Sequence, residues 1–409
     1  MLKCIAVTQV TQGMYIHKLD GSWIDHDFWK SSFLLSQATD VQRLLDSRVK
    51  KVWIDTRKGC DMLSADTAAP TQQAQTPAVE VEAPVHVLPR ADMAAEVDRA
   101  IQLCAVAKRA VIEMFSDLRM GRAVEPTQVL KLVQDISDSL QRHPHALISL
   151  ARLKTANEYT YMHSVAVCGL MMALARQLDL PPSLVQEAGF AGLFHDVGKM
   201  AISEAILNKP GALTDAEFMR MRDHPQEGVA MLRHCPQISV LVLDVCLHHH
   251  EKCDGSGYPH GLVQDQISLF AKMGAVCDVY DAVTSERSYK SAWGPADAIR
   301  KMAEWKGHFD ERVFQAFVRC VGIYPVGALV RLESGRIAVV IDQNATSLLT
   351  PVVKVFFSAR TRLPIAQAVV NLAEQADKIV ARERVEEWGF EHVDQLWSGL
   401  APSKTSYFD

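Results

Sequence analysis

Residues of the types that bind metal ions occur in five separated segments of the chain. They are His163, the pair His195-Asp196, His224, the run His248-His249-His250-Glu251, and the pair Asp278 and Asp281. Imidazole and carboxylate ligands without thiolates favour iron, manganese, zinc or a similar divalent metal. A single histidine on an apolar helix face is more often a core residue than a ligand. Several such groups on separate helices are better explained by one shared site at the centre of a helical bundle.

Helical periodicity predicts that these groups point toward the core. His163 lies on the apolar stripe of one expected helix. In the next expected helix, His195, Asp196 and Lys199 share such a stripe. Buried charged groups are costly unless they are paired or bound to a metal. The two carboxylates of the segment 278–281 lie three residues apart in a further apolar helix, so they share one face.

Helical phase also sorts the histidine run. The apolar face of the preceding segment, residues 238–247, continues at i+4 into His249 and His250. His248 instead follows Asp244 on a polar line of the same helix. We therefore predict that His249 and His250 point inward as a pair and that His248 lies on a solvated edge.

Four segments together resemble the HD-GYP domain family, in its order and spacing, over residues 150–320. They are HDVGK (195–199), NKPGALTDAEFMRMRDHPQEG (208–228), HHEKCDGSGYPHGL (249–262) and DVYDAVTSERSYK (278–290). The start of the chain, with GMYIHKLDGSWIDHDFW, resembles the uncharacterised domain that often precedes HD-GYP domains in bacteria. HD-GYP proteins are similar to metal-dependent hydrolases that open cyclic di-GMP to linear pGpG and often GMP. The resemblance therefore implies a cyclic di-GMP phosphodiesterase of biofilm and motility signalling.

The resemblance also implies metal ligands. The implied ligands are His195, Asp196, His224, His249, His250 and Asp278, with His163 either a further ligand or a neighbouring group. Some members hold a third ion through a carboxylate one helical turn before that histidine, where this chain has Tyr159. We therefore expect two divalent ions. Iron or manganese is favoured, and zinc, nickel, cobalt or magnesium also suits the family.

Asp196 and Lys199 are the expected catalytic residues. In phosphodiester hydrolysis two metal ions activate water and bind phosphate oxygens. A carboxylate has two oxygens, so Asp196 is the natural bridge between the ions, and Lys199 would offset charge developing on a phosphate oxygen. The expected substrate contacts are Lys199, Asp281, Arg287, Lys290 and Tyr258. The last three also have plainer interpretations, as a solvated helix end for Arg287 and Lys290 and as a turn for the Gly-Tyr-Pro segment.

The elements that must position these residues change in character along the chain of 409 residues. Short alternating apolar runs predict a small, mostly β N-terminal domain over residues 1–63, and a Pro/Ala/Gln-rich linker follows over 64–90. Residues 91–322 read as an all-helical HD-type catalytic bundle. Residues 323–409 read as a β-rich extension with one short helix around Arg382–Trp397. The predicted fold class is mainly α.

Composition narrows the class of protein. The chain is 48% hydrophobic and 22% charged, as in an ordinary soluble protein, and its net charge of −5 argues against a general DNA binder. It has no long apolar run and no recognisable signal peptide, so we predict no membrane insertion. Nine cysteines without a CxxC pair suit a reducing cytoplasm.

Two other functions compete with the phosphodiesterase. One is a weakly catalytic cyclic di-GMP receptor that signals through a partner such as a GGDEF-domain protein. The other is a phosphohydrolase of the wider HD family that acts on mononucleotides. The complete ligand set favours an enzyme over a receptor, and the Gly-Tyr-Pro segment argues against a mononucleotide substrate. The expected small molecules are cyclic di-GMP and pGpG, and a homodimer is compatible with the sequence.

Overall fold

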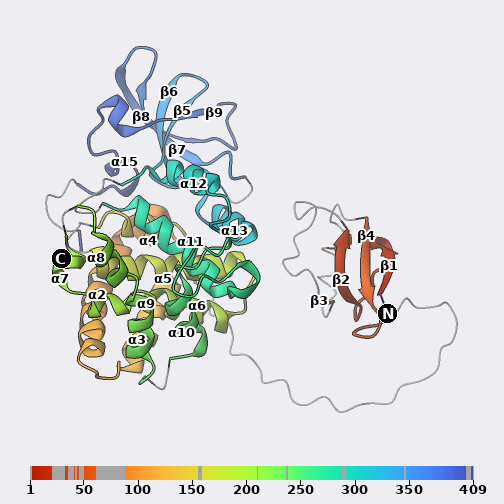
Figure 1. The fold of residues 1–409 in the computed structure, drawn as a ribbon. Coiled ribbons are helices and arrows are strands. Elements are labelled where there is room, and N and C mark those ends of the chain that lie inside the picture. The colour runs from red at the N-terminus through yellow and green to blue at the C-terminus, as the bar shows by residue number, and fades with distance from the viewer. Residues whose placement is uncertain are drawn as a thin grey trace. The chain divides into compact units, whose positions relative to one another are not determined.

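The chain forms two compact units, Met1–Val85 and His86–Asp409 (Figure 1). No helix in the described parts of either unit is long and apolar enough to cross a membrane. The computed structural model describes residues 2–20, 33–35, 41, 44–45, 50–60, 88–154, 159–209, 211–235, 238–286, 292–344, 347–401 and 407–408.

The described N-terminal unit is an antiparallel sheet with strand order β1-β4-β2-β3. Its strands are β1 (Leu2–Ala6), β2 (Tyr15–Asp20), β3 (Phe33–Leu34) and β4 (Lys51–Asp55). Side chains alternate along a strand, so Val52 and Ile54 are buried while Trp53 between them is exposed. The predicted small β-rich N-terminal part is confirmed.

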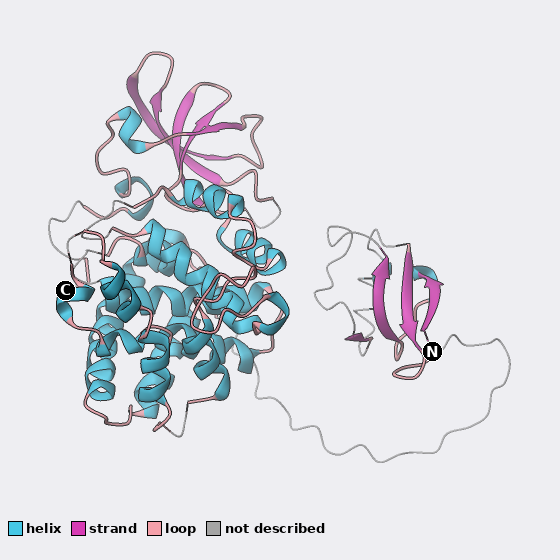
Figure 2. Cartoon of the chain, in the orientation of Figure 1, coloured by secondary structure: helices cyan, strands magenta, loops and turns pink. Residues whose placement is uncertain are grey.

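The larger unit is mostly helical, as predicted (Figure 2). Its helices before the C-terminal sheet are α2 (Met93–Arg119), α3 (Pro126–Arg142), α4 (Ala146–Ala151), α5 (Tyr159–Gln177), α6 (Pro182–Phe194), the 3-10 helix η4 (Val197–Ala201), α7 (Glu204–Leu207), α8 (Asp215–Met221), α9 (His224–Leu232), α10 (Val240–His248), the 3-10 helix η5 (Gln264–Gln266), α11 (Leu269–Thr284), α12 (Pro295–Glu304) and α13 (Glu311–Val321). A capping box formed by Thr214 and Glu217 begins α8.

Helix α5 is the centre of this unit. It contacts α2, α3, α4, α6, α11 and α13, and every residue from Met162 to Ala175 is buried. A helix that is apolar all round is stable only inside a protein. Its closest crossing is with α6, where a Cβ on Gly192 would lie 2.7 Å from the Val167 carbonyl oxygen. Because His163 lies in α5, it is held in the middle of the bundle.

The predicted continuous helix through His195, Asp196 and Lys199 is wrong. Helix α6 ends at Phe194, and η4 begins two residues after His195. The reason is a close backbone contact, since a Cβ on Gly198 would lie 1.8 Å from the carbonyl oxygen of His224. The tighter η4 turn thus brings the start of α9 beside the His-Asp pair.

A five-stranded antiparallel sheet with order β8-β7-β6-β5-β9 follows the helices, at one end of the unit (Figure 1). Its strands are β5 (Leu329–Leu332), β6 (Arg336–Asp342), β7 (Val352–Ser358), β8 (Leu363–Asn371) and β9 (Ile379–Arg382). Ala296 of α12 joins the buried core of this sheet. The predicted boundaries at residues 91 and 323 fall within this single compact unit and remain predictions.

The single C-terminal helix expected around Arg382–Trp397 is wrong. Arg382 ends β9, and two short helices follow, α14 (Val385–Trp388) and α15 (Gln395–Ser398). Between them Gly389 has φ 65° and His392 has φ 57°. A right-handed helix cannot continue through residues in the left-handed region, so the charged segment breaks in two.

Candidate metal centre

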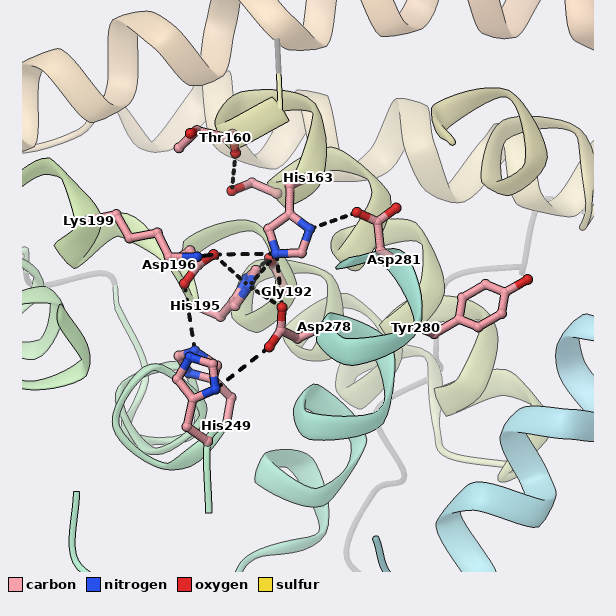
Figure 3. Close-up of polar contacts among 12 residues, drawn as sticks. Thr160, His163, Gly192, His195, Asp196, Lys199, His249, Asp278, Tyr280 and Asp281 are labelled. Carbon is pink, nitrogen blue, oxygen red and sulfur yellow. Dashed lines mark hydrogen bonds and ion pairs between the residues drawn. The ribbon is translucent and has the colours of Figure 1, made fainter. Parts of the chain in front are cut away.

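Seven histidine and aspartate side chains from five segments meet beside α5. Figure 3 labels five of them, His163, His195, Asp196, His249 and Asp278. They form two groups that share Asp196, and within each group the candidate ligand atoms lie within 4.8 Å of one another. Group A is Asp196, His224, His249 and His250, and group B is His163, His195, Asp196 and Asp278. Every residue predicted as a metal ligand therefore lies in one of the two groups, and so does His163.

Asp196 presents one oxygen to each group. Its Oδ1 lies 3.2 Å from Nε2 of His224 and 3.7 Å from Nε2 of His249. Its Oδ2 lies 3.3 Å from Nε2 of both His163 and His195. The residue is 1% exposed, and Oδ1 has no hydrogen-bond donor among the described residues. A buried carboxylate oxygen without a donor is costly, and a cation would satisfy it.

Three of the imidazole rings are oriented by the backbone. In His195, His224 and His249, Nδ1 lies 2.8, 2.8 and 3.0 Å from a carbonyl oxygen three or four residues earlier. In the neutral ring this bond requires the proton on Nδ1, so Nε2 keeps its lone pair. This arrangement is typical of histidines that bind metal through Nε2.

These lone pairs converge. Nε2 of His224 lies 3.4 Å from Nε2 of His249, and Nε2 of His195 lies 3.2 Å from Nε2 of His163. Facing lone pairs at these distances repel unless a proton or a metal ion lies between or beside them. Together with the unsatisfied oxygen of Asp196, this fits a divalent cation in each group.

His163 has a different partner on its outer nitrogen. Its Nδ1 lies 2.7 Å from Oδ2 of Asp281, and its Nε2 lies 3.0 Å from Oδ1 of Asp278 (Figure 3). Burial disfavours the charged ring, but hydrogen bonds with Asp196, Asp278 and Asp281 outweigh it and raise the pKa of His163 to about 10. The three carboxylates therefore favour a positive charge at the His163 ring. A metal ion in group B would supply that charge in place of the proton.

The substrate contact predicted for Asp281 is wrong. Asp281 is 1% exposed, and both of its oxygens lie 2.8 Å from the Nζ atom of Lys154. With the additional bond to His163, this carboxylate lies behind group B and is out of reach of a ligand. Lys154 could not be predicted, because no periodic pattern links it to Asp281, 127 residues away.

His248 lies outside both groups. Its Nδ1 lies 2.7 Å from Oδ1 of Asp244, and its Nε2 lies 3.0 Å from Nδ1 of His260. The sorting of the run into an inward pair and an outer histidine therefore matches the structure. The helix itself is shorter than expected, since α10 ends at His248 and His249 is its C-cap.

The Gly-Tyr-Pro turn packs against group A. The ring of Tyr258 stacks on His250, with centroids 4.6 Å apart, and the guanidinium of Arg222 lies 4.6 Å from the Tyr258 centroid. Buried Glu251 accepts hydrogen bonds from the backbone N–H groups of His260 and Leu262 at 2.7 and 3.0 Å. Arg222 was not predicted, and Glu251, which belongs to the run of metal-binding residue types, binds the turn instead of joining either group. The turn thus holds His250 from one side.

The centre opens on the side of His250 and Lys199, whose side chains are 22% and 18% exposed. Lys199 donates a hydrogen bond from Nζ to Oδ2 of Asp196 (Figure 3). Its contact with substrate, and that of Tyr258, remain predictions. Arg287 and Lys290 lie outside the described residues, as does the side chain of Tyr159.

Comparison with known proteins gives two family matches. Residues 2–129 match a domain of unknown function, DUF3391, and residues 134–313 match the HD domain. The chain is 58% identical to the cyclic di-GMP phosphodiesterase PA4108 of Pseudomonas aeruginosa, over 100% of this chain and 99% of that protein.

More distant relatives match only part of the chain. The cyclic di-GMP phosphodiesterase response regulator RpfG of Xanthomonas campestris is 38% identical over 42% of this chain and 47% of its own length. The 3′3′-cGAMP-specific phosphodiesterase 1 of Vibrio cholerae is 33% identical over 40% of this chain and 38% of its own length.

Proposed function

Because the chain belongs to the HD-GYP family of HD-domain proteins, with the domain of unknown function at its N-terminus, we propose that it is a metal-dependent phosphodiesterase that hydrolyses cyclic di-GMP. The relative that matches nearly end to end is named as such an enzyme, which supports the substrate. The reaction would lower the concentration of this bacterial second messenger and thereby act on biofilm formation and motility.

The observation that carries the proposal is the division of Asp196 between two ligand groups. One oxygen faces His224 and the other faces His163 and His195. This suits two divalent cations sharing one carboxylate, with iron or manganese favoured for mixed imidazole and carboxylate ligands. When bound, the cations would activate water and neutralise charge on the phosphate.

The remaining chemistry belongs to side chains at the opening. The ammonium group of Lys199 lies beside Asp196 and is partly exposed, so it would offset negative charge on a phosphate oxygen as the bond breaks. Tyr258 and Arg222 would keep His250 at the rim in its ligand orientation. The first product would be linear pGpG, and a second hydrolysis would give GMP.

The proposal is tested with protein purified without oxygen and loaded separately with iron, manganese, zinc or magnesium. Cyclic di-GMP, 3′3′-cGAMP and a mononucleotide are supplied in parallel, and the products are separated by chromatography. We expect cyclic di-GMP to be converted fastest, with pGpG appearing first.

Two outcomes would contradict the proposal. Tight binding of cyclic di-GMP with no turnover under any metal would show a receptor that signals through a partner such as a GGDEF-domain protein. Faster turnover of 3′3′-cGAMP or of the mononucleotide would assign a different substrate.

A further inference from the structure

A buried lysine stands behind group B. The side chain of Lys154 is 0% exposed, although lysine is among the residues least often buried. Its Nζ atom lies 2.8 Å from each oxygen of Asp281 and 3.1 Å from the carbonyl oxygen of Ala151. Burying an ammonium group costs several kcal/mol unless close partners compensate it, and here a carboxylate and a helix-terminal carbonyl do so.

Two successive hydrogen bonds connect Lys154 to the metal centre. Asp281 uses Oδ2, one of the oxygens bound by Lys154, to contact Nδ1 of His163 at 2.7 Å. The opposite nitrogen of His163 faces Asp196 and Asp278. This relay of hydrogen bonds runs from Lys154, just after α4, through Asp281 on α11 to His163 on α5.

Each hydrogen bond of this relay restricts the orientation of the next side chain. Two contacts from one ammonium group fix the rotation of the Asp281 carboxylate, because a rotated carboxylate would lose at least one of them. The fixed Oδ2 holds the ring of His163 with Nδ1 outward and Nε2 inward. A carboxylate in this position orients a metal-binding histidine and increases its basicity as a ligand.

We propose that Lys154 is a positioning residue for the metal ion of group B, acting through Asp281 on His163. The proposal rests on the metal centre of the proposed function and assigns a role to a residue that never touches the metal or the substrate. A purely structural brace between α4 and α11 is the competing explanation.

The two explanations differ in where they act. In group A, the Nδ1 atoms of His224 and His249 bond to backbone carbonyl oxygens, so within the described residues no comparable side-chain relay reaches these two rings. Loss of the lysine should therefore weaken metal binding in group B and spare group A. A general loosening of the bundle would affect both.

The test measures bound metal rather than turnover alone. Wild-type protein and Lys154→Met are loaded with manganese, titrated with a competing chelator, and analysed for metal equivalents per chain. We expect one ion to keep its wild-type affinity and the other to bind about tenfold to a hundredfold more weakly. Arg142→Met is the matched control, since Arg142 forms a largely buried ion pair with Glu96 at 2.7 Å and has no contact with either group.

A double-mutant cycle separates positioning from bracing. If Lys154 acts through Asp281, then Lys154→Met should weaken the same ion no further in an Asp281→Asn background. Additive losses would overturn the proposal, as would wild-type affinity for both ions or an equal loss of both. If Lys154→Met does not fold, Lys154→Gln, which removes the charge and is too short to keep both contacts with Asp281, is held to the same outcomes.

Failure of this proposal is distinguishable from failure of the proposed function. Wild-type protein that binds two ions but does not hydrolyse cyclic di-GMP would refute the activity and leave the relay intact. Wild-type protein that hydrolyses cyclic di-GMP with an ion in group A alone would refute the relay.

Discussion

Asp196 is the residue on which both metal groups depend, because each of its oxygens faces a different set of histidines. We predict that Asp196→Ala lowers bound metal well below two equivalents and abolishes measurable turnover. Losing about 4 kcal/mol of transition-state stabilisation already slows a reaction roughly a thousandfold. Metal analysis and product chromatography measure the two effects, and circular dichroism checks that the helices remain. Wild-type activity in this variant would refute the assignment of the centre.

His248 provides the matched negative case within the same run of histidines. Its ring is bound by Asp244 and His260 on the outer side of α10, away from the shared aspartate. We predict that His248→Ala keeps nearly the wild-type metal content, whereas His249→Ala loses metal from group A. Both variants are measured by the same chelator titration. Loss of a whole metal equivalent in His248→Ala would show that the outer histidine is a ligand.

The crossing of η4 and α9 is the element-scale feature that assembles the centre. A Cβ at Gly198 would lie 1.8 Å from the His224 carbonyl oxygen and 2.4 Å from the Gly228 backbone nitrogen. Both are backbone atoms, so the two elements would have to separate. We predict that Gly198→Ala costs about 3 kcal/mol or more of folding stability, at the upper end of overpacking effects, and displaces His224 from Asp196.

The check on this prediction combines a denaturant midpoint with metal content. Gly294→Ala is the control, because Gly294 has φ −57° and its added Cβ would meet nothing within 4 Å. We expect the control to match wild type in metal content. Equal stability and equal metal content in Gly198→Ala would contradict the close approach of η4 and α9.

What the sequence could predict at this scale follows from periodicity. Apolar repeats predicted the helices that carry His163 and Asp278, α5 and α11, and helical phase predicted which two of the three adjacent histidines point inward. The ends of α6 and of the C-terminal helices could not be predicted this way. They depend on a backbone contact between Gly198 and His224 and on the positive φ of Gly389 and His392. The contact between Gly198 and His224 arises only once separate segments are packed together, and the positive φ values leave no trace in an apolar repeat.

At the scale of the whole molecule, the helices and the C-terminal sheet form one compact unit. Arg152, which follows α4, donates a hydrogen bond from Nη2 to the Val326 carbonyl oxygen at 2.8 Å. His143 Nε2, at the end of α3, lies 3.5 Å from Oδ1 of Asp342 at the end of β6. Lys154 lies two residues beyond Arg152, so the segment that contacts the sheet also begins the relay toward His163.

This junction should weaken in acid. Burial lowers the pKa of His145 to about 4, and the nearby charges of His143 and Arg90 act in the same direction while Asp342 opposes them. The folded pKa lies below the unfolded value of 6.5, so between these two pH values the unfolded chain binds more protons. The stability contributed by the neutral ring is therefore complete above pH 6.5 and is lost as the pH falls toward 4.

We predict that His145→Asn removes much of this pH dependence. Between pH 7 and pH 4 the free energy of unfolding should fall by up to about 3 kcal/mol more in the wild-type chain than in the variant. This follows from the lowering of the His145 pKa from 6.5 to about 4. Guanidinium unfolding of metal-free protein measures the difference without interference from metal release. Because burial penalises the charged ring, the wild-type chain should lose stability relative to the variant as the pH falls from 6.5 toward 4. Parallel stability curves for the two proteins across this range would show that the ring at the junction is not kept neutral by burial.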